Sequence, residues 1–421
     1  MQSVSETSDS PVSNEGKRMG HPMHWITVFI AMMCLLISNG MVITGITAFD
    51  SAMLTEFSDW SRGDLKMRGL ITLALTGLLA PFVGILIDKI GVKFLVMVGA
   101  VVLSACFYAY GNIRDISDLY LIHAAFSIVL LACGLNVAVI LVSNWFVKLR
   151  GTAIGIAVVG TSLGGAVLAP LFGSWMADGM TWREGMQLAA LIPSALFLLA
   201  LFLLRNRPTD IGLKPFGFSG EAHASEADLS QHGLTYKEAI KTRSFWSIAF
   251  IAMFTFYTIM GFQANLVLHL MDLGFTLQSA AAGLSVLFVP ALIGKFLFGL
   301  VADKITGKRV LYTNLLLMLT GLIGMLFADK DNVLIAIGLI GFMWGGFYTL
   351  LQLNAVNNFG LKASGKLLGT ITVLDAFGGG LGIYATGAIY DAYGSYQNAF
   401  MIFCVLVALS VILISQVKKH V

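Results

Sequence analysis

The amino-acid sequence predicts an all-α polytopic membrane protein whose twelve transmembrane helices form two six-helix, pseudo-symmetric halves. Three observations lead to this prediction. Of the 421 residues, 57% are hydrophobic and only 12% are charged, which is too few charges to cover a soluble globule. Twelve apolar runs are long enough to cross a hydrocarbon core about 30 Å thick. Finally, one short phrase of sequence occurs twice, half a chain apart.

We expect each apolar run to be a helix, because a backbone in lipid must satisfy its own hydrogen bonds. Between positions 206 and 243 the apolar pattern stops, so we expect a cytoplasmic linker between halves that span 24–205 and 244–416. The polar residues 1–23 are expected to form a disordered cytoplasmic tail, and 417–421 a short C-terminal one. The approximate centres of the runs are Leu36, Leu79, Val102, Leu131, Thr161, Phe197, Phe256, Pro290, Leu319, Gly346, Phe377 and Ala408.

The repeated phrase runs from Gly84 to Lys93 and again from Gly299 to Arg309, and its first glycines are 215 positions apart. At the same offset, Gly164-Gly165 returns as Gly379-Gly380. A repeat at half-length in an apolar chain is typical of two homologous membrane halves with a substrate site between them. The repeat therefore predicts both the symmetry of the fold and the place to look for a site.

The distribution of basic residues predicts the orientation in the membrane. Nineteen lysines and arginines fall on the side of the termini and the linker, and six on the opposite side. Cytoplasmic loops carry the excess of basic residues, so both termini are expected to face the cytoplasm. The protein is expected in the inner or plasma membrane of the cell. The net charge of +3 then reflects topology and suggests no nucleic-acid partner. The six residues are Arg62, Lys66, Arg68, Arg114, Arg183 and Lys330.

Two charged residues are placed deep inside the apolar runs. Lys295 is the one basic residue that we do not assign to a loop, and Asp375 is the one acid at a similar depth. A charge in mid-bilayer costs several kcal/mol unless it faces a cavity or a partner, so these two are the leading site candidates. At the offset of 215 they correspond to Ala80 and Gly160, so the first half is neutral where the second is charged.

The repeated phrase resembles the signature of the major facilitator superfamily, whose fold has twelve helices. Within it, Phe57-Ser58-Asp59-Trp60-Ser61-Arg62, before the second span, is similar to an element of the monocarboxylate and oxalate/formate transporters. Segments 148–155 and 207–215 are similar to theirs as well. The resemblance covers all twelve spans, but the elements of this subgroup lie in the first half.

This resemblance implies a role for Lys295, because a basic residue at that position of the eighth span binds the substrate carboxylate in these transporters. The chain also departs from the group: Ala291 replaces an acid one turn earlier, and Asp375 lies where oxalate exchangers have a second lysine. One cation and one anion argue against a dicarboxylate. A monocarboxylate on Lys295 with a coupling proton on Asp375 fits, as does a zwitterion that contacts both. A permanent Lys295–Asp375 salt bridge is the structural alternative.

Further site candidates are polar residues of the cavity-lining spans and charged or glycine residues of the repeated phrase. An interhelical hydrogen bond is an equally good explanation for each of the polar ones. The candidates for substrate binding are Asn39, Asn136, Gln263, Tyr348 and Gln352. The candidates for a cytoplasmic latch between conformations are Gly84, Asp88, Lys89, Gly299, Asp303 and Lys304.

The sequence thus predicts a secondary active transporter that moves a small, monocarboxylate-like organic anion by alternating access, coupled to protons. Zwitterion symport and organic anion exchange remain open, and multidrug efflux is a more distant alternative. A membrane enzyme is not expected, because the chain shows no catalytic constellation. We expect no cofactor and no metal, and a protein that functions as a monomer in the lipid bilayer.

Overall fold

The computed structural model describes residues 21–218, 233–302, 304–360 and 362–418. Within them, twelve helical segments are long and apolar enough to cross a membrane, and each contains one of the predicted centres, so the predicted fold class is confirmed. The N-terminal half comprises α1 (Pro22–Asn39), the π-helical η2 (Gly40–Thr44), the 3₁₀ helix η3 (Gly45–Phe49), α2 (Asp50–Glu56), α3 (Arg62–Tyr110), α4 (Ile116–Cys133), α5 (Leu135–Trp145), α6 (Arg150–Ala177), α7 (Trp182–Ala189) and α8 (Ile192–Phe202). After η4 (Pro208–Ile211) and α10 (Tyr236–Ala239), the C-terminal half comprises α11 (Arg243–Asp272), α12 (Leu277–Ala302), α13 (Gly307–Leu326), α14 (Val333–Phe359), α15 (Ser364–Tyr393) and α16 (Gln397–Gln416).

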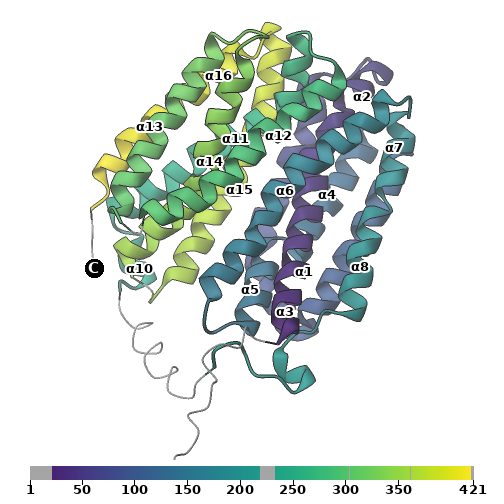
Figure 1. Cartoon of the computed structure of the whole chain (residues 1–421). Coiled ribbons are helices and arrows are strands. Elements are labelled where there is room, and N and C mark those ends of the chain that lie inside the picture. The colour runs from purple at the N-terminus through teal and green to yellow at the C-terminus, as the bar shows by residue number, and fades with distance from the viewer. Residues whose placement is uncertain (1–20, 219–232, 303, 361, 419–421) are drawn as a thin grey trace, which may run out of the picture.

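The helices form two bundles side by side, the N-terminal one purple to teal and the C-terminal one green to yellow in Figure 1. Each bundle encloses a buried apolar cluster, which contains Phe107 and Trp145 in the first half and Phe245 and Phe347 in the second. The start of α1 and the short helix α10 lie at the same end of the molecule, which we call the linker end. The opposite end, with α2 and the start of α7, is the loop end.

An equivalent close packing of helices occurs in each half, α1 against α6 and α11 against α15. A Cβ atom added to Gly160 would lie 2.2 Å from the carbonyl oxygen of Met32, and one added to Gly378 would lie 2.4 Å from that of Met253. No side chain fits at such a distance, so glycine lets the two backbones touch. The matching contact one turn further on is also made in both halves, by Gly164 with Leu36 and by Gly382 with Tyr257.

These contacts change the register of the internal repeat in its eleventh span. Gly160 and Gly378 are 218 positions apart, so the expected match of Gly164 with Gly379 at an offset of 215 is wrong. Asp375 therefore corresponds to Ala157 of α6 and not to Gly160. In a glycine-rich segment the sequence alone does not define how the two halves align, whereas the contacts between helix backbones do. The contrast between a charged second half and a neutral first half is unaffected.

Two spans of the N-terminal half are interrupted near the middle of the bundle. The first passes from α1 through a π turn at Gly40–Thr44 to the 3₁₀ turn that follows. The fourth breaks at Gly134, where the backbone is extended and a Cβ atom would lie 1.9 Å from the carbonyl oxygen of Leu130. Such π turns are frequent at functional sites. Both interruptions lie next to asparagines, Asn39 and Asn136, that line the central cavity.

The two copies of the repeated phrase make different turns. In the first, the chain reverses within α3 at Gly91, whose φ of 79° lies in the region that favours glycine. In the second, α12 ends at Ala302 and α13 begins at Gly307. Of the latch candidates, Lys89 and Lys304 are exposed. Asp303 lies outside the described residues, as do the side chain of Asp88 and the surroundings of Gly84 and Gly299, so the latch stays a prediction.

Candidate functional site

A cavity with two lobes lies between the halves, lined by residues of both. The lobes measure about 230 and 190 Å³, and both are lined by Asn39, Leu135, Phe256, Met260 and Tyr348. Sites for drug-sized ligands usually measure 300–1,000 Å³. Because the two lobes adjoin, the cavity as a whole has room for a ligand of small to drug-like size.

Lys295 of α12 lines the larger lobe together with Phe288 and Trp344. Its ammonium donates hydrogen bonds to the hydroxyl of Thr161 (2.7 Å) and to the carbonyl oxygen of Val158 (3.3 Å), both on α6. Lys295 is thus connected to the opposite half through neutral acceptors. Among the described residues, no carboxylate lies within ion-pair distance of it. Its positive charge has no counter-charge in this conformation.

Asp375 of α15 lines the smaller lobe and is 3% exposed. Neither of its carboxylate oxygens accepts a hydrogen bond from any described residue. The nearby hydroxyls of Thr76 and Thr372 donate instead to backbone carbonyl oxygens of their own helices, at 2.7 and 3.0 Å. Lys295 and Asp375 therefore line adjoining lobes without pairing, and the salt bridge between them is not formed in this conformation.

Four of the five polar candidates line the cavity with these two charges. Asn39 and Tyr348 contribute to both lobes, Asn136 to the lobe of Asp375 and Gln263 to that of Lys295. Gln352 differs, since the residues that line the two lobes in the described part of the chain do not include it. It follows Tyr348 on α14 by one helical turn, toward the linker end.

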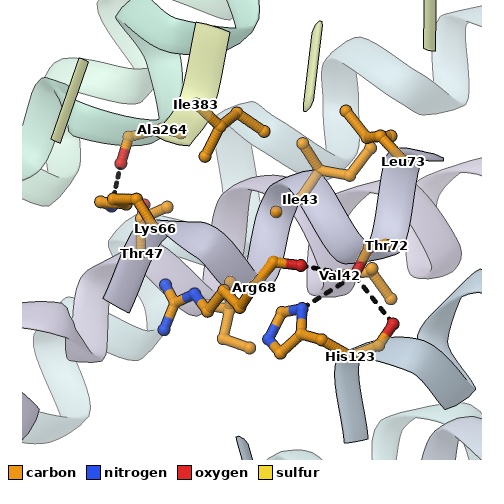
Figure 2. A pocket seen from close by; sticks show the side chains of 12 residues that line it. Val42, Ile43, Thr47, Lys66, Arg68, Thr72, Leu73, His123, Ala264 and Ile383 are labelled. Carbon is orange, nitrogen blue, oxygen red and sulfur yellow. Dashed lines mark hydrogen bonds between the residues drawn. The ribbon is translucent and has the colours of Figure 1, made fainter. Parts of the chain in front are cut away.

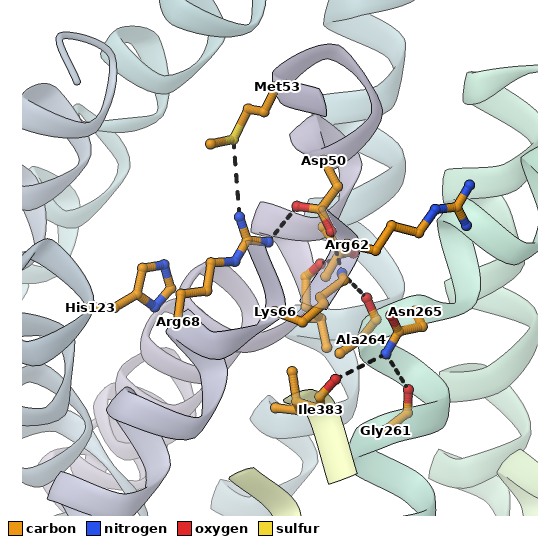
Figure 3. A network of polar contacts seen from close by, with 12 residues as sticks. Asp50, Met53, Arg62, Lys66, Arg68, His123, Gly261, Ala264, Asn265 and Ile383 are labelled. Atoms are coloured by element: carbon orange, nitrogen blue, oxygen red, sulfur yellow. Dashed lines mark hydrogen bonds and ion pairs between the residues drawn. The ribbon is translucent and has the colours of Figure 1, made fainter. Parts of the chain in front are cut away.

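A second set of charges is buried nearer the loop end, and the sequence analysis missed it. Lys66 and Arg68, expected in an outer loop, lie inside α3 at 1% and 3% exposure and both pair with Asp50 of α2, which is fully buried (Figure 3). The expectation that Lys295 and Asp375 were the only deep charges is therefore wrong. Asp50 is the single acid between His24 and Glu56 in a long apolar run, and this interruption was the available signal.

The halves are joined at the loop end by Arg62, which is the last residue of the Phe57–Arg62 motif and the first residue of α3. Its guanidinium donates two hydrogen bonds to Asp272 at 2.7 Å and one to the hydroxyl of Tyr396 at 2.8 Å. It also lies over the ring of Tyr390, 3.6 Å from the centroid. Asp391 accepts hydrogen bonds from the first backbone N–H groups of α3, where the helix dipole favours an anion. The loop end is therefore closed by charge-assisted hydrogen bonds between the halves.

The linker end of the same interface is open. On α6, Gly151 and Gly155 lie on the stripe that continues through Gly165, which contacts Phe288 of the other half. On α15, Gly365 and Gly369 occupy the equivalent stripe, but a Cβ atom at any of these four glycines would meet nothing within 4 Å. The surfaces that face each other across the interface are thus packed toward the loop end and separated toward the linker end.

Two halves around a central cavity that contains buried charges and is closed at one end have the architecture of a membrane transporter. Comparison with known families agrees: the Major Facilitator Superfamily model matches residues 26–382 and 272–419, and the chain belongs to that family. It is a multi-pass membrane protein of the type that moves small molecules across lipid bilayers.

Relatives place the chain near one group of this family. It is 28% identical over 265 residues to monocarboxylate transporter 13 of Bos taurus, a match that covers 62% of this chain and 58% of that protein. The protein of the same name from Rattus norvegicus is 26% identical over 77% of this chain and 72% of its own length. A solved bacterial homolog of the human lysosomal transporter Spinster, inward-facing and occupied, shares the fold with a TM-score of 0.72 at 18% identity, covering 94% of this chain and 96% of that one.

Proposed function

We propose that this protein is a secondary active transporter that moves a small, monocarboxylate-like organic anion by alternating access, coupled to protons. One observation carries the proposal: among the described residues, the cavity between the halves is lined by one cation, Lys295, and one carboxylate, Asp375, and neither has a charged partner there. The relatives named monocarboxylate transporters support the choice of an anion.

Lys295 receives the carboxylate of the substrate in this mechanism. A neutral hydroxyl and a carbonyl oxygen now accept its hydrogen bonds, and a carboxylate is a stronger acceptor for an ammonium than either. Substrate binding therefore removes Lys295 from Thr161 and loosens a contact between the halves. Because this residue is a lysine, the substrate is bound by a point charge and not by the bidentate fork of an arginine.

Asp375 carries the coupling proton. A buried carboxylate without hydrogen-bond donors is costly when ionised, and a proton removes that cost. Protonation and substrate binding then occur in adjoining lobes that share Asn39 and Tyr348. This arrangement couples the two events without direct contact between Lys295 and Asp375.

The linker end is the cytoplasmic end. Nineteen basic residues lie on that side, and only four remain on the other once Lys66 and Arg68 are placed inside the bundle. The described conformation, closed at the loop end and open at the linker end, is then inward-open. Rocking of the halves would close the glycine stripe of α6 on α12 and that of α15 on α3, and would open the loop end.

Counter-flow in proteoliposomes tests the proposal, with lactate, pyruvate, oxalate and alanine as probes and with or without a proton gradient. Lys295→Ala should reduce lactate uptake to the level of empty liposomes, whereas Lys366→Ala, which removes an exposed lysine, should leave it unchanged. Asp375→Asn should make uptake insensitive to the pH gradient, and Asp178→Asn is the matched control at an exposed acid. Wild-type lactate transport by the Lys295 variant would contradict the assigned role.

A zwitterionic substrate is the second candidate, and the unpaired oxygens of Asp375 favour it, because an ammonium group would supply the missing donors. Alanine counter-flow separates the two functions. If alanine is carried and both Lys295→Ala and Asp375→Asn abolish its binding, the substrate bridges the lobes. If Asp375→Asn alters only the response to pH, the acid carries a proton.

A further inference from the structure

A cluster of three charges lies buried in the outer part of the N-terminal half, away from the central cavity. The Asp50 carboxylate of α2 pairs through one oxygen with Lys66 and through the other with Arg68, both of α3. Arg68 also donates a hydrogen bond to the hydroxyl of Tyr110 at 2.9 Å, and a longer one to the sulfur of Met53. The cluster is therefore fixed in place by helices of its own half (Figure 3).

The cluster has a surplus of positive charge. Asp50 supplies one negative charge to two cations, and the other acceptors around Arg68 are neutral. Besides its bond to Asp50, the Lys66 ammonium donates a hydrogen bond to the backbone carbonyl oxygen of Ala264. Ala264 belongs to α11 in the opposite half. A carbonyl dipole does not neutralise a buried ammonium, so one positive charge of the cluster lacks a counter-ion among the residues that the structure describes.

A small cavity of about 20 Å³ adjoins these cations, large enough for about one water molecule (Figure 2). Most of its wall comes from the N-terminal half, including Thr47, Thr72 and His123, but Ala264 and Ile383 close it from the C-terminal half. Separation of the halves at the loop end would withdraw those two residues. The cavity would then open on the side where Lys66 loses its acceptor.

The small cavity also adjoins the central one. Ile43 and Leu73 line both the small cavity and the lobe that contains Asp375, so two apolar side chains form the partition between them. A ligand entering from the loop end would meet the cations of the cluster before it reached Lys295. The order of the two sites along the molecule is therefore outer cluster, partition, central cavity.

We propose that Lys66, held with Arg68 by Asp50, is an outer anion-binding site that receives the substrate carboxylate when the loop end opens. In the closed conformation the carbonyl oxygen of Ala264 occupies the position that the carboxylate takes in the open one. The identity of the anion as substrate rests on the proposed function. The surplus positive charge of the cluster, and its exposure when the loop end opens, are independent of the proposed function.

The first experiment is independent of what the protein transports. A cysteine introduced by Thr47→Cys reports on the small cavity. We would measure the rates at which an anionic and a cationic methanethiosulfonate of similar size modify this cysteine from the loop-end side. The anionic reagent should react faster, and Lys66→Met should reduce the ratio of the two rates about tenfold, the effect of one charge-assisted contact. The controls are the protein without Thr47→Cys and Lys330→Met, which removes an exposed lysine at the loop end.

The Lys66→Met variant is expected to fold, because it leaves Asp50 and Arg68 as a balanced pair. An unchanged ratio of rates in this variant would overturn the proposal, even if lactate transport confirms the proposed function. If Lys66→Met lowers the ratio of anionic to cationic modification rates, but the wild-type protein transports no anion, the outer anion site is supported and the proposed substrate class is contradicted.

The second experiment measures lactate transport from each side, in right-side-out and inside-out vesicles. Lys66→Met should raise KM about tenfold for lactate presented at the loop end and leave KM from the linker end unchanged, and Lys66→Arg should restore it. A purely structural role would lower kcat or change KM equally from both sides, and that result would overturn the proposal. If the wild-type protein does not carry lactate, the rates of cysteine modification decide.

Discussion

The two ends of the interface between the halves differ in how they are held. At the loop end, Arg62 binds Asp272 and Tyr396, and Lys66 reaches across to the carbonyl oxygen of Ala264. At the linker end, the glycines of α6 and α15 that face the other half meet nothing. Directional polar contacts hold the two halves together at the loop end, which must later open. At the linker end, small residues leave room for the two halves to move together. The difference describes one state of a rocking transporter.

The largest effect is expected where glycine is essential within one half. In Gly164→Leu the new side chain would begin 2.4 Å from the carbonyl oxygen of Leu36, so α1 and α6 could not pack. We expect no monodisperse protein in size-exclusion chromatography after extraction in detergent, because overpacking at a backbone contact exceeds the usual cost of about 1–3 kcal/mol. Recovery of a stable protein would contradict the close packing of these helices.

Bulky residues at the open end should abolish transport without affecting folding. Gly155 and Gly369 have free space in the inward-open state, so Gly155→Trp and Gly369→Trp should keep the wild-type melting temperature in detergent. Closure of the linker end would then be blocked, and uptake should fall at least tenfold, a barrier of about 1.4 kcal/mol or more. Normal uptake by both variants would show that these stripes do not approach the opposite half.

The closed end can be weakened at Arg62. Arg62→Ala removes two hydrogen bonds to Asp272 and one to Tyr396, so the loop end should open more often. Charge-assisted hydrogen bonds of this kind contribute about 1.5–3 kcal/mol each when desolvated, but these are partly exposed and the total should be smaller. Labelling of the Thr47→Cys reporter from the loop-end side should accelerate several-fold, and Arg62→Lys should give an intermediate rate. A slower rate would contradict the role of Arg62 in closing this end.

The smallest effect is expected at Thr161, a neutral partner of Lys295. Thr161→Val removes one hydrogen bond across the interface and keeps the shape of the side chain. Lys295 should then be released more readily to substrate, lowering KM for lactate several-fold, since one such bond contributes about 1 kcal/mol. Kinetics of uptake in proteoliposomes measure the change. A rise in KM would mean that Thr161 contacts the substrate directly.

The sequence predicted those parts of the molecule that follow from the cost of exposing groups to lipid. Twelve apolar runs identified twelve spans, and isolated charges within them identified Lys295 and Asp375, which do line one cavity. The reason is that a charged side chain in the middle of an apolar span is stable only where it faces a cavity or a polar partner.

The outer cluster was missed because its residues lie near the ends of apolar runs. A charge at such a position is equally consistent with a loop, and only the packing of α2 against α3 shows that Asp50, Lys66 and Arg68 are buried. The register of α15 was missed for a related reason. In a run rich in glycine many alignments look alike, and the contact of Gly378 with Met253 is not visible in the sequence.

The distance between the two open stripes tests the central claim most directly. Spin labels at Gly155→Cys and Gly369→Cys, in a background without the four native cysteines, report the separation of the linker end by double electron–electron resonance. Alternating access predicts a long distance that is joined by a distinctly shorter population when lactate and a proton gradient are supplied. A single long distance under all conditions, in a protein that transports lactate, would contradict the account.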